Sequence, residues 1–314
     1  MGSFITFLMR AIIQGTPLLY GATGEIITEK SGNLNLGVPG IMYIGGISGV
    51  IGAFIYQEST KRIEPVLAVL IPLFSCLLGA LLASLLYCFL TVTLRANQNV
   101  TGLALTTFGV GFGNFFGSSL IKVSGSSVPY LSLVKFAKAF KTLRFDDVGF
   151  MVYLAPVIAV AAALVLSKTR IGLQLRAVGE SPATADAAGI NVTKYKYFAT
   201  CIGGMIAGLG GLFWVMDKLG GIWANNSFGD RGWLAVAVVI FAMWRPALSI
   251  PASYLFGGLY ILYNYINVSM ELQPILQMLP YVVTVVVLVL VSMRKKRENQ
   301  PPAALGLSYF REER

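Results

Sequence analysis

Side chains that could carry out chemistry are scarce in this chain. Its 314 residues include no histidine, 14 aspartates and glutamates, and three cysteines without the spacing of metal ligands. Histidine is the commonest metal ligand and general base, and no GxxxxGKS/T, HExxH or GxSxG motif offers a phosphate-binding loop, a zinc site or a nucleophile instead. The acidic residues near or within apolar segments are Glu25, Glu29, Asp217 and Asp230. We therefore expect no metal site and no enzyme active site, which leaves a transporter or a channel.

Composition places the chain in a membrane. Hydrophobic residues make up 56% of it and charged residues 12%, whereas soluble domains carry about 25% charged residues. The net charge of +10 would suggest a nucleic acid as partner of a soluble protein. Here the lysines and arginines lie at the ends of apolar segments, as in the RKKR run at 294–297, where they anchor helices to lipid headgroups. We expect a lipid bilayer and no nucleic acid as partner.

Several apolar segments approach the roughly 20 residues that a membrane-spanning helix needs. They predict an all-α, polytopic transmembrane helix bundle of about nine spans. The seventh segment is short, and we expect it to be tilted or to pair with a re-entrant piece at 219–228. The placement of lysine and arginine favours an N-terminus outside the cell. The predicted spans are 4–24, 34–56, 66–94, 100–121, 150–167, 197–216, 232–244, 247–266 and 274–293.

The second apolar segment opens with polar and helix-breaking residues. Irregular backbone at membrane depth is tolerated where protein or a water-filled cavity satisfies its polar groups. The pattern predicts a broken second helix near 33–40 that lines a solute path, with an interfacial turn between the first two helices as the alternative. Polar and aromatic residues of the fourth segment complete this path; its polar members could instead form hydrogen bonds between helices. The predicted path residues are Asn33, Asn35, Gly37, Gly40, Thr106, Phe108, Phe112 and Asn114.

A loop of small and polar residues, RAVGESPATADAAGINV at 176–192, separates two long apolar segments. Lysines and arginines flank it on both sides, so the bilayer would not accommodate it and it is expected in the cytoplasm. Ser181 can cap a short helix whose first turn takes Pro182. The loop is predicted to be a surface for a partner protein.

Three segments together resemble a known family. The loop at 176–192 looks like the cytoplasmic coupling segment of bacterial ABC importer permeases of the ribose/branched-chain amino acid type, with Ser181 in place of the usual asparagine. TEKSGNLNLGVPG at 28–40 is similar to a second family segment, although Pro39 stands where a glutamate is common. GDRGWLAVAVVIFAMWRP at 229–246 resembles the nucleoside and simple-sugar branch. The residues implied to couple to an ATPase are Arg176, Gly179, Glu180, Ser181, Pro182, Ala183, Ala187 and Gly189.

The resemblance implies how the chain is organised and which partners it has. It implies a transmembrane permease domain at 1–293, with a cytoplasmic coupling loop at 168–196 and an external loop at 122–149, followed by a cytoplasmic tail at 294–314. No cofactor is bound by the chain itself, and ATP and Mg²⁺ act through a partner ABC ATPase, expected to be a double-domain polypeptide. A second related permease and an external substrate-binding lipoprotein complete the assembly, in the bacterial cytoplasmic membrane.

The expected solute is a purine nucleoside, with a simple sugar of the ribose type as the alternative. A nucleoside carries hydroxyls and a base but no charge, so amides, hydroxyls and aromatic faces suffice to bind it. An ion-coupled secondary transporter is a further alternative. It would need ionisable groups inside the membrane, and Arg10 and Glu25 are the residues that come closest to this requirement.

Overall fold

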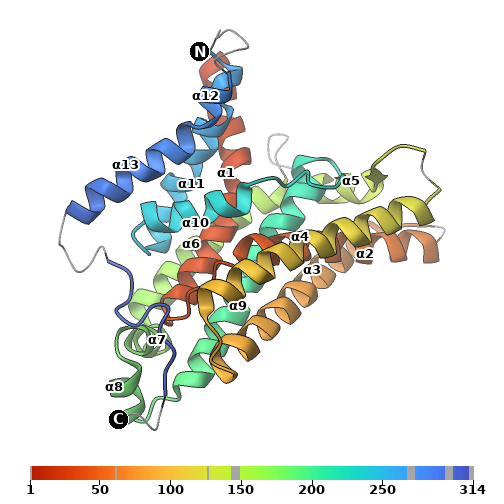
Figure 1. Ribbon diagram of the computed structural model, residues 1–314. Helices are drawn as coiled ribbons and strands as arrows, with labels where there is room; N and C mark the ends of the chain where they lie inside the picture. The colour runs from red at the N-terminus through yellow and green to blue at the C-terminus, as the bar shows by residue number, and fades with distance from the viewer. Residues whose placement is uncertain are drawn as a thin grey trace.

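The computed structural model describes residues 2–60, 62–125, 127–142, 149–266, 273–293 and 300–310. These residues are almost entirely helical, with one antiparallel pair of short strands, β1 (Leu131–Ser132) and β2 (Ile222–Trp223) (Figure 1). Two helices continue as π-helical turns, α3 into Phe89–Thr93 and α9 into Trp214–Lys218. The helices are α1 (Gly2–Glu29), α2 (Val38–Ser59), α3 (Pro65–Cys88), α4 (Gln98–Val123), α5 (Val134–Thr142), α6 (Phe150–Lys168), α7 (Arg170–Glu180), α8 (Pro182–Ala187), α9 (Val192–Phe213), α10 (Arg231–Phe241), α11 (Pro246–Ile261), α12 (Gln273–Gln277) and α13 (Leu279–Met293).

The all-α fold is confirmed, and each predicted span overlaps at least one helix, although 274–293 covers two, α12 and α13. Four helices are long and apolar enough to cross a membrane by length and composition: α2, α3 with its π turn, α6, and α9 with its π turn. The seventh segment became α10, whose 11 residues rise about 16 Å, roughly half of the hydrocarbon core. The count of nine spans stays a prediction. The RKKR run at 294–297 lies outside the described residues.

The irregular backbone that was predicted near 33–40 lies before α2 and not within it. α1 continues to Glu29, residues 30–37 form a buried connection, and α2 then runs unbroken from Val38. Pro39 and Gly40 therefore belong to the first turn of α2, where a proline costs nothing because the backbone N–H groups of that turn have no partner within the helix. The second helix is not broken, and the turn between the first two helices is the arrangement that formed.

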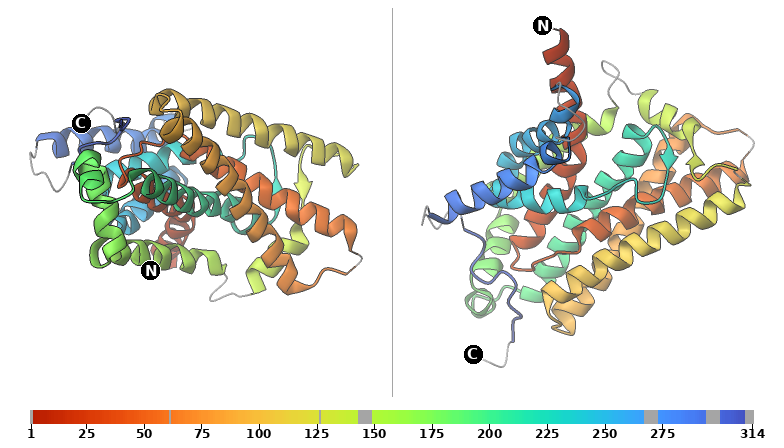
Figure 2. Two further views of the ribbon diagram at one scale, coloured as in Figure 1. Left: turned by 90° about the horizontal axis from the view of Figure 1, so that it is seen from below. Right: turned by 45° about the horizontal axis from the view of Figure 1, so that its top comes forward.

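Small residues allow the helices to pack closely around α1, α2 and α9. A Cβ atom added at Gly45 would lie 2.6 Å from the Cα of Gly208 on α9, and one added at Gly109 on α4 would lie 2.5 Å from the carbonyl oxygen of Gly40. Gly24 and Gly203 face each other in the same way. Because lipid gives little hydrophobic drive between helices, such close contacts supply the packing energy. The two views of Figure 2 show these helices crossing at the centre of the molecule.

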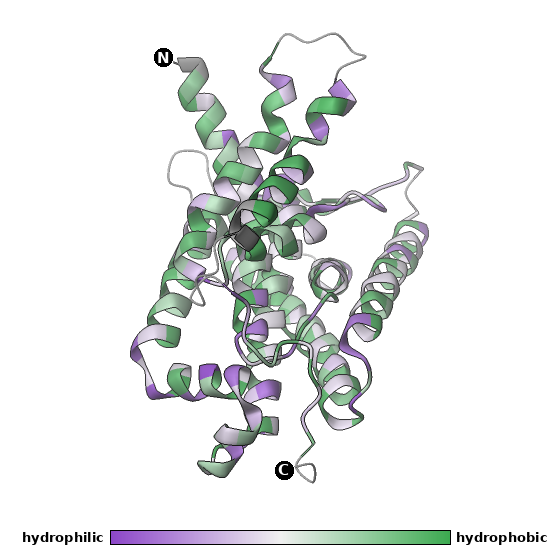
Figure 3. Ribbon diagram, turned by 60° about the vertical axis from the view of Figure 1, so that its left-hand side comes forward, coloured by the Kyte–Doolittle hydropathy of each residue, from purple (hydrophilic) through white to green (hydrophobic). Residues whose placement is uncertain are grey.

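Polar elements gather at the two ends of the bundle. The N-terminus lies at one end, and α7, α8 and residues 300–310 lie at the other (Figure 1). Figure 3 shows several hydrophilic residues on α7, while the long helices between the ends are mostly hydrophobic. The cytoplasmic location of residues 168–196 stays a prediction. The external loop predicted at 122–149 contains β1 and α5, whose Phe136 and Phe140 are fully buried.

Candidate functional site

The short helix α8 has the start that the sequence predicts. Ser181 is its N-cap, and the Ser181 side chain accepts a hydrogen bond from the backbone N–H of Thr184 at 3.4 Å. The hydroxyl oxygens of Ser181 and Thr184 are 2.8 Å apart, so these two side chains also form a hydrogen bond. Pro182 occupies the first turn, where its fixed φ suits a helix. The cap therefore fixes both the starting point and the direction of α8.

One face of α8 is anchored and the other is open. Ala185 is buried against Val178 of α7 and Val192 of α9. The opposite side exposes only small side chains, so a groove on another protein could accept the helix without steric conflict. Among the other predicted coupling residues, Arg176 and Glu180 are exposed on α7 and Gly179 is buried. The exposed residues of α8 and the turn after it are Ala183, Thr184, Ala187, Ala188 and Gly189.

Gly179 connects this surface to the membrane helices. The end of α7 rests on the turn that follows α1, and a Cβ atom at Gly179 would overlap the carbonyl oxygen of Lys30 and lie 3.1 Å from the backbone N of Gly32. Only glycine allows the two backbones to approach this closely. A displacement of α7 and α8 therefore acts directly on the connection at 30–37.

That connection is tied to α4 and α9 by buried polar groups. The Asn33 side chain donates from Nδ2 to Thr200 Oγ1 at 3.0 Å, and Asn35 Oδ1 accepts from the Gly37 backbone at 3.0 Å. Thr106 Oγ1 donates to the Leu36 carbonyl at 2.8 Å. Asn33 and Asn35 are fully buried in this conformation. These residues thus form one junction between helices, which we call the junction. Its members are Asn33, Asn35, Gly37, Gly40 and Thr106.

Asn114 lies in a different place, in a cluster of amides around residues 219–230. Tyr43 donates its hydroxyl hydrogen to Asn114 Oδ1 at 3.0 Å, and Asn114 Nδ2 donates to Asn226 Oδ1 at 2.9 Å. The Asn226 backbone N–H reaches the Tyr43 hydroxyl at 2.8 Å, and its φ of +58° is one that asparagine tolerates. Next to it, Asn225 Nδ2 donates to Ser118 Oγ at 2.7 Å. We call Tyr43, Asn114, Ser118, Asn225 and Asn226 the amide cluster.

Aromatic rings adjoin the amide cluster. Tyr43 stacks edge-on against Trp223, with the ring centroids 5.5 Å apart. Phe112 of α4 lies 4.5 Å from Phe116 and 5.8 Å from Phe108 between centroids. Phe112 and Asn114 are two residues apart and so project from nearly opposite sides of α4. Trp223 is therefore the ring that adjoins the amide cluster through Tyr43.

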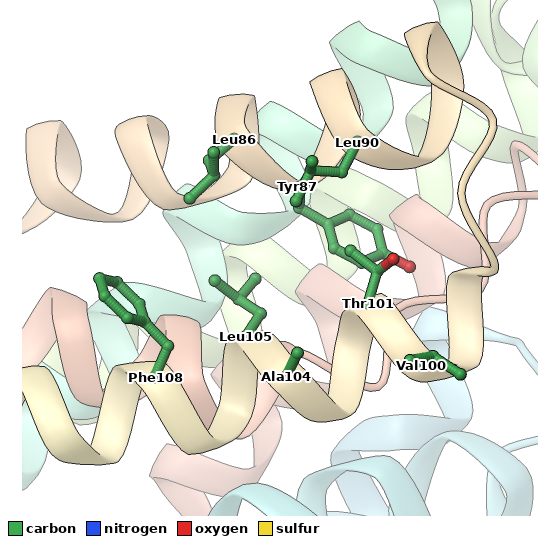
Figure 4. Close-up of a pocket in the computed structure, with 8 residues that line it drawn as sticks. All are labelled: Leu86, Tyr87, Leu90, Val100, Thr101, Ala104, Leu105 and Phe108. Carbon is green, nitrogen blue, oxygen red and sulfur yellow. The ribbon is translucent and has the colours of Figure 1, made fainter.

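Phe108 itself faces a groove between α3 and α4 with a volume of about 280 Å³ (Figure 4). Leu86 and Tyr87 of α3 and Leu90 of the π turn after it line the groove opposite α4. The Tyr87 hydroxyl hydrogen is not available to a molecule in the groove, because it is donated to the carbonyl oxygen of Leu34. This groove is apolar, so it suits an acyl chain or another apolar helix.

Sequence reasoning missed several members of these sites. Asn225 and Asn226 lie in the segment predicted to be re-entrant, and the pair of asparagines in an apolar region was the signal that could have identified them. Tyr43 gave no such signal, because tyrosine is common in membrane helices. Within the described part of the chain, no three His, Cys, Asp or Glu side chains gather closely enough to hold a metal ion.

Arg231, the first residue of α10, is enclosed by aromatic rings and holds the start of that helix in place. The Arg231 guanidinium lies 3.7 Å from the centroid of the Trp214 ring and 5.0 Å from that of Tyr260. Its Nη1 donates to the Phe228 carbonyl at 2.6 Å. These cation–π contacts fix the segment that carries the amide cluster against the π turn after α9.

Residues 300–310 form a strap across the end of the bundle that carries α7 and α8. The Ala304 backbone N–H donates to the Gly179 carbonyl at 3.0 Å, and that of Gly306 donates to the Gly32 carbonyl at 3.3 Å. Tyr309 donates its hydroxyl hydrogen to Asp186 Oδ2 at 2.8 Å. The strap therefore touches α7, α8 and the 30–37 connection together, a role that its composition did not indicate.

Comparison with known proteins places these features in context. Residues 7–292 match the family described as "Branched-chain amino acid transport system / permease component". The putative glucose ABC transporter permease protein TsgC13 of Haloferax volcanii is 34% identical over 261 residues, which cover 81% of this chain and 76% of that protein. The nucleoside ABC transporter permease protein NupC of Lactococcus lactis is 33% identical over 292 residues, 89% of this chain and 90% of that protein.

The guanosine ABC transporter permease protein NupQ of Bacillus subtilis is 27% identical over 288 residues, 88% of this chain and 89% of that protein. H. volcanii and L. lactis each contain a second matching permease protein, also named for glucose and for nucleoside transport, at 25% and 22% identity.

Proposed function

This chain belongs to the family of permease components of branched-chain amino acid transport systems, and from that premise we propose that it is the membrane-spanning subunit of an ATP-driven nucleoside importer. A partner ABC ATPase binds the ATP and Mg²⁺. The observation that carries this proposal is the capped helix α8, which exposes a face of small residues and is anchored through Ala185. Such a helix offers a partner a docking element that the bilayer cannot contact.

The coupling runs from α8 through Gly179 to the 30–37 connection. ATP binding changes the shape of the ATPase groove and moves α7 and α8. Because Gly179 contacts Lys30 and Gly32, and because Thr106 holds Leu36, that motion reaches α2 and α4. For ATP to drive transport, the ATPase must bind the two permease conformations with different affinities. Asn33 and Asn35 would then transmit this motion between helices, in addition to lining the path of the solute.

The solute proposed is a purine nucleoside, and the amide cluster supports it. Asn114 and Asn226 offer donors and acceptors for ribose hydroxyls, and the ring of Tyr43, itself a member of the cluster, packs edge-on against Trp223 and provides aromatic surface beside them. The cluster consists of amides, hydroxyls and rings, which suits an uncharged solute. A simple sugar is the second candidate, since one similar permease is named for glucose transport.

The remaining partners complete the assembly. A second, related permease would cover exposed apolar helix faces of this chain, and an external binding lipoprotein would deliver the nucleoside. The ATPase is proposed to be a double-domain polypeptide, and the membrane to be the bacterial cytoplasmic membrane. The pairs of matching permeases in H. volcanii and L. lactis support the heterodimer.

The test is uptake by the reconstituted transporter. Proteoliposomes that contain both permeases, the ATPase and the binding protein would be loaded with ATP and offered labelled guanosine, adenosine, inosine, ribose, glucose or leucine. We expect accumulation of the nucleosides only, and none when ATP is omitted. Uptake of ribose, glucose or leucine without any nucleoside uptake would contradict the assignment of the solute, and uptake that does not require ATP would contradict the mechanism.

A further inference from the structure

A cavity of about 620 Å³ opens at the end of the bundle that carries α7 and α8. Its walls come from the turn after α1, the end of α6, α7, the turn between α10 and α11, and the beginning of the strap. It lies apart from the amide cluster and shares no residue with it. The side chains that decide its chemistry are Lys30, Arg176, Glu180, Trp244 and Arg245.

Positive charge predominates in this cavity. Among the described residues that line the cavity, Lys30, Arg176 and Arg245 outnumber the one carboxylate, that of Glu180. The carboxylate of Glu29 lies behind Trp244, and counting it as well still leaves an excess of one positive charge. Burial lowers the pKa of Lys30; the charges of Glu180 and Glu29 oppose this, and the charges of Arg176 and Arg245 add to it. Three cations brought together in a half-buried space repel one another, and an anion among them would remove that repulsion.

The turn that carries Trp244 and Arg245 holds an uncommon backbone. Met243 and Trp244 have φ values of +51° and +54°, a conformation that bulky residues rarely adopt. The Trp244 indole N–H donates to the Glu29 carboxylate, which fixes the ring at the wall of the cavity. Strain of this kind persists where the surrounding structure enforces it, and it is commoner at ligand sites than elsewhere.

An apolar stripe leads along α6 into the cavity. Val157, Val160 and Leu164 are exposed by 63%, 47% and 54%, and they follow one another at helical spacing toward Ser167, which lines the cavity. Leu166 also contributes to the wall. A charged chamber that opens onto a membrane-facing apolar stripe has the two-part chemistry of a phospholipid. An acidic protein segment or a free phosphate would use the cations and leave the stripe without a role.

We propose that this cavity binds the headgroup phosphate of an anionic phospholipid from the cytoplasmic leaflet, with Lys30, Arg176 and Arg245 around the phosphate and an acyl chain along Val157, Val160 and Leu164. Basic pockets at the cytoplasmic ends of membrane helices bind anionic headgroups in this way. The lipid would hold the end of α1, α7 and the turn before α11 together. Anionic lipid would thus be a structural component of the contacts that connect α7 and α8 to the membrane helices.

The test is native mass spectrometry of the purified full chain, delivered from phosphatidylcholine and titrated with phosphatidylglycerol. We expect one phosphatidylglycerol per chain to be retained more tightly than the others. A Lys30→Gln/Arg245→Gln double variant should bind it about 30-fold more weakly. The variant Lys168→Gln removes an exposed cation near the end of α6 that does not line the cavity, and it should bind as the native chain does. Lys30→Arg keeps the charge and should retain the lipid.

The other sources of an anion give different results. If inorganic phosphate displaces phosphatidylglycerol at equal concentration, the cavity is a phosphate site and the lipid proposal is wrong. The proposal is also wrong if the native chain binds no lipid preferentially while the double variant loses its binding to the ATPase, since the cations then serve an acidic protein segment. Equal lipid retention by the double variant and the native chain would contradict it directly. The single variants Lys30→Gln and Lys30→Arg form the matched pair, because they differ in the charge at residue 30. Loss of lipid by the first and retention by the second separates the role of charge from misfolding of the double variant.

Discussion

Gly179 and Lys30 are in backbone contact, and this contact joins the surface formed by α7 and α8 to the long apolar helices. A side chain at residue 179 would overlap the carbonyl oxygen of Lys30, and the Gly179 carbonyl also accepts a hydrogen bond from the strap at Ala304. Three segments that are far apart in the sequence therefore meet at one glycine. Any motion of α7 must either carry the turn after α1 along or break this contact.

Substitution of Gly179 by valine should separate α7 from the turn after α1. The overlap involves a backbone atom, which cannot rotate away as a flexible side chain can, so α7 must shift. We expect the complex to assemble while ATP-dependent uptake falls by about tenfold or more, an order of magnitude that corresponds to about 1.4 kcal/mol. Uptake and ATP hydrolysis would be measured on the same proteoliposomes. Gly111→Val is the control, because a Cβ atom at Gly111 meets nothing within 4 Å; equal uptake by the two variants would rule out the role of this contact.

Replacing Gly109 by valine should weaken the packing of α2 on α4. A Cβ atom at Gly109 would approach the carbonyl oxygen of Gly40 to 2.5 Å, and overpacking of this kind costs about 1–3 kcal/mol. A thermal-shift assay in detergent should show a lower melting temperature than that of Gly111→Val. If the two variants have the same melting temperature, the close approach of α2 and α4 contributes nothing measurable to stability.

Asn114→Ala should weaken nucleoside transport without unfolding the protein. It removes the bonds to Asn226 and Tyr43 but leaves the apolar packing of α4 intact. Since a lost hydrogen bond to a neutral group is worth about 0.5–1.5 kcal/mol, we expect KM for nucleoside to rise about 2–10-fold. Phe115→Leu, on the exposed side of α4, is the control. An unchanged KM in Asn114→Ala would remove the amide cluster from the solute path.

Tyr309→Phe should loosen the strap from α8. The bond to Asp186 is half-exposed, so we expect a loss of only about 0.5–1 kcal/mol after allowance for solvent. Hydrogen exchange of the α8 backbone amides should become about 2–5-fold faster. Asp186→Asn should have a smaller effect, because the amide oxygen can still accept the bond. Unchanged exchange in both variants would show that the strap does not restrain α8.

Local patterns in the sequence account for the helices and for the start of α8. An apolar run of about 20 residues has few alternatives to a helix in lipid, and the Ser181–Pro182 cap depends on residues that are neighbours in the chain. The cluster of asparagine, glycine and proline at 33–40 correctly indicates irregular backbone. Its placement within the second helix was wrong because Pro39 suits a first helical turn as well as a break, and the pattern does not distinguish the two.

The parts that sequence reasoning missed depend on partners far apart in the chain. Tyr43 and Asn226 are 183 residues apart, and the bond between them forms only after α2 and the segment after α9 have packed together. The strap is a similar case, because its bonds at Ala304 and Gly306 use backbone groups that any residue would provide. The predicted path residues consequently divide among the junction, the amide cluster and the groove of Phe108, a division that periodicity could not reveal.

If α8 couples a partner ATPase to the membrane helices, Ala183→Trp should break that coupling. Ala183 lies on the exposed face of α8, where an indole would fill the space that the ATPase groove must occupy. The measurement is nucleoside-stimulated ATP hydrolysis and uptake by the reconstituted complex, compared with Ala161→Trp on the exposed side of α6. We predict that Ala183→Trp inserts normally but loses both activities, whereas Ala161→Trp keeps them. Full stimulated hydrolysis and uptake in Ala183→Trp would contradict the account.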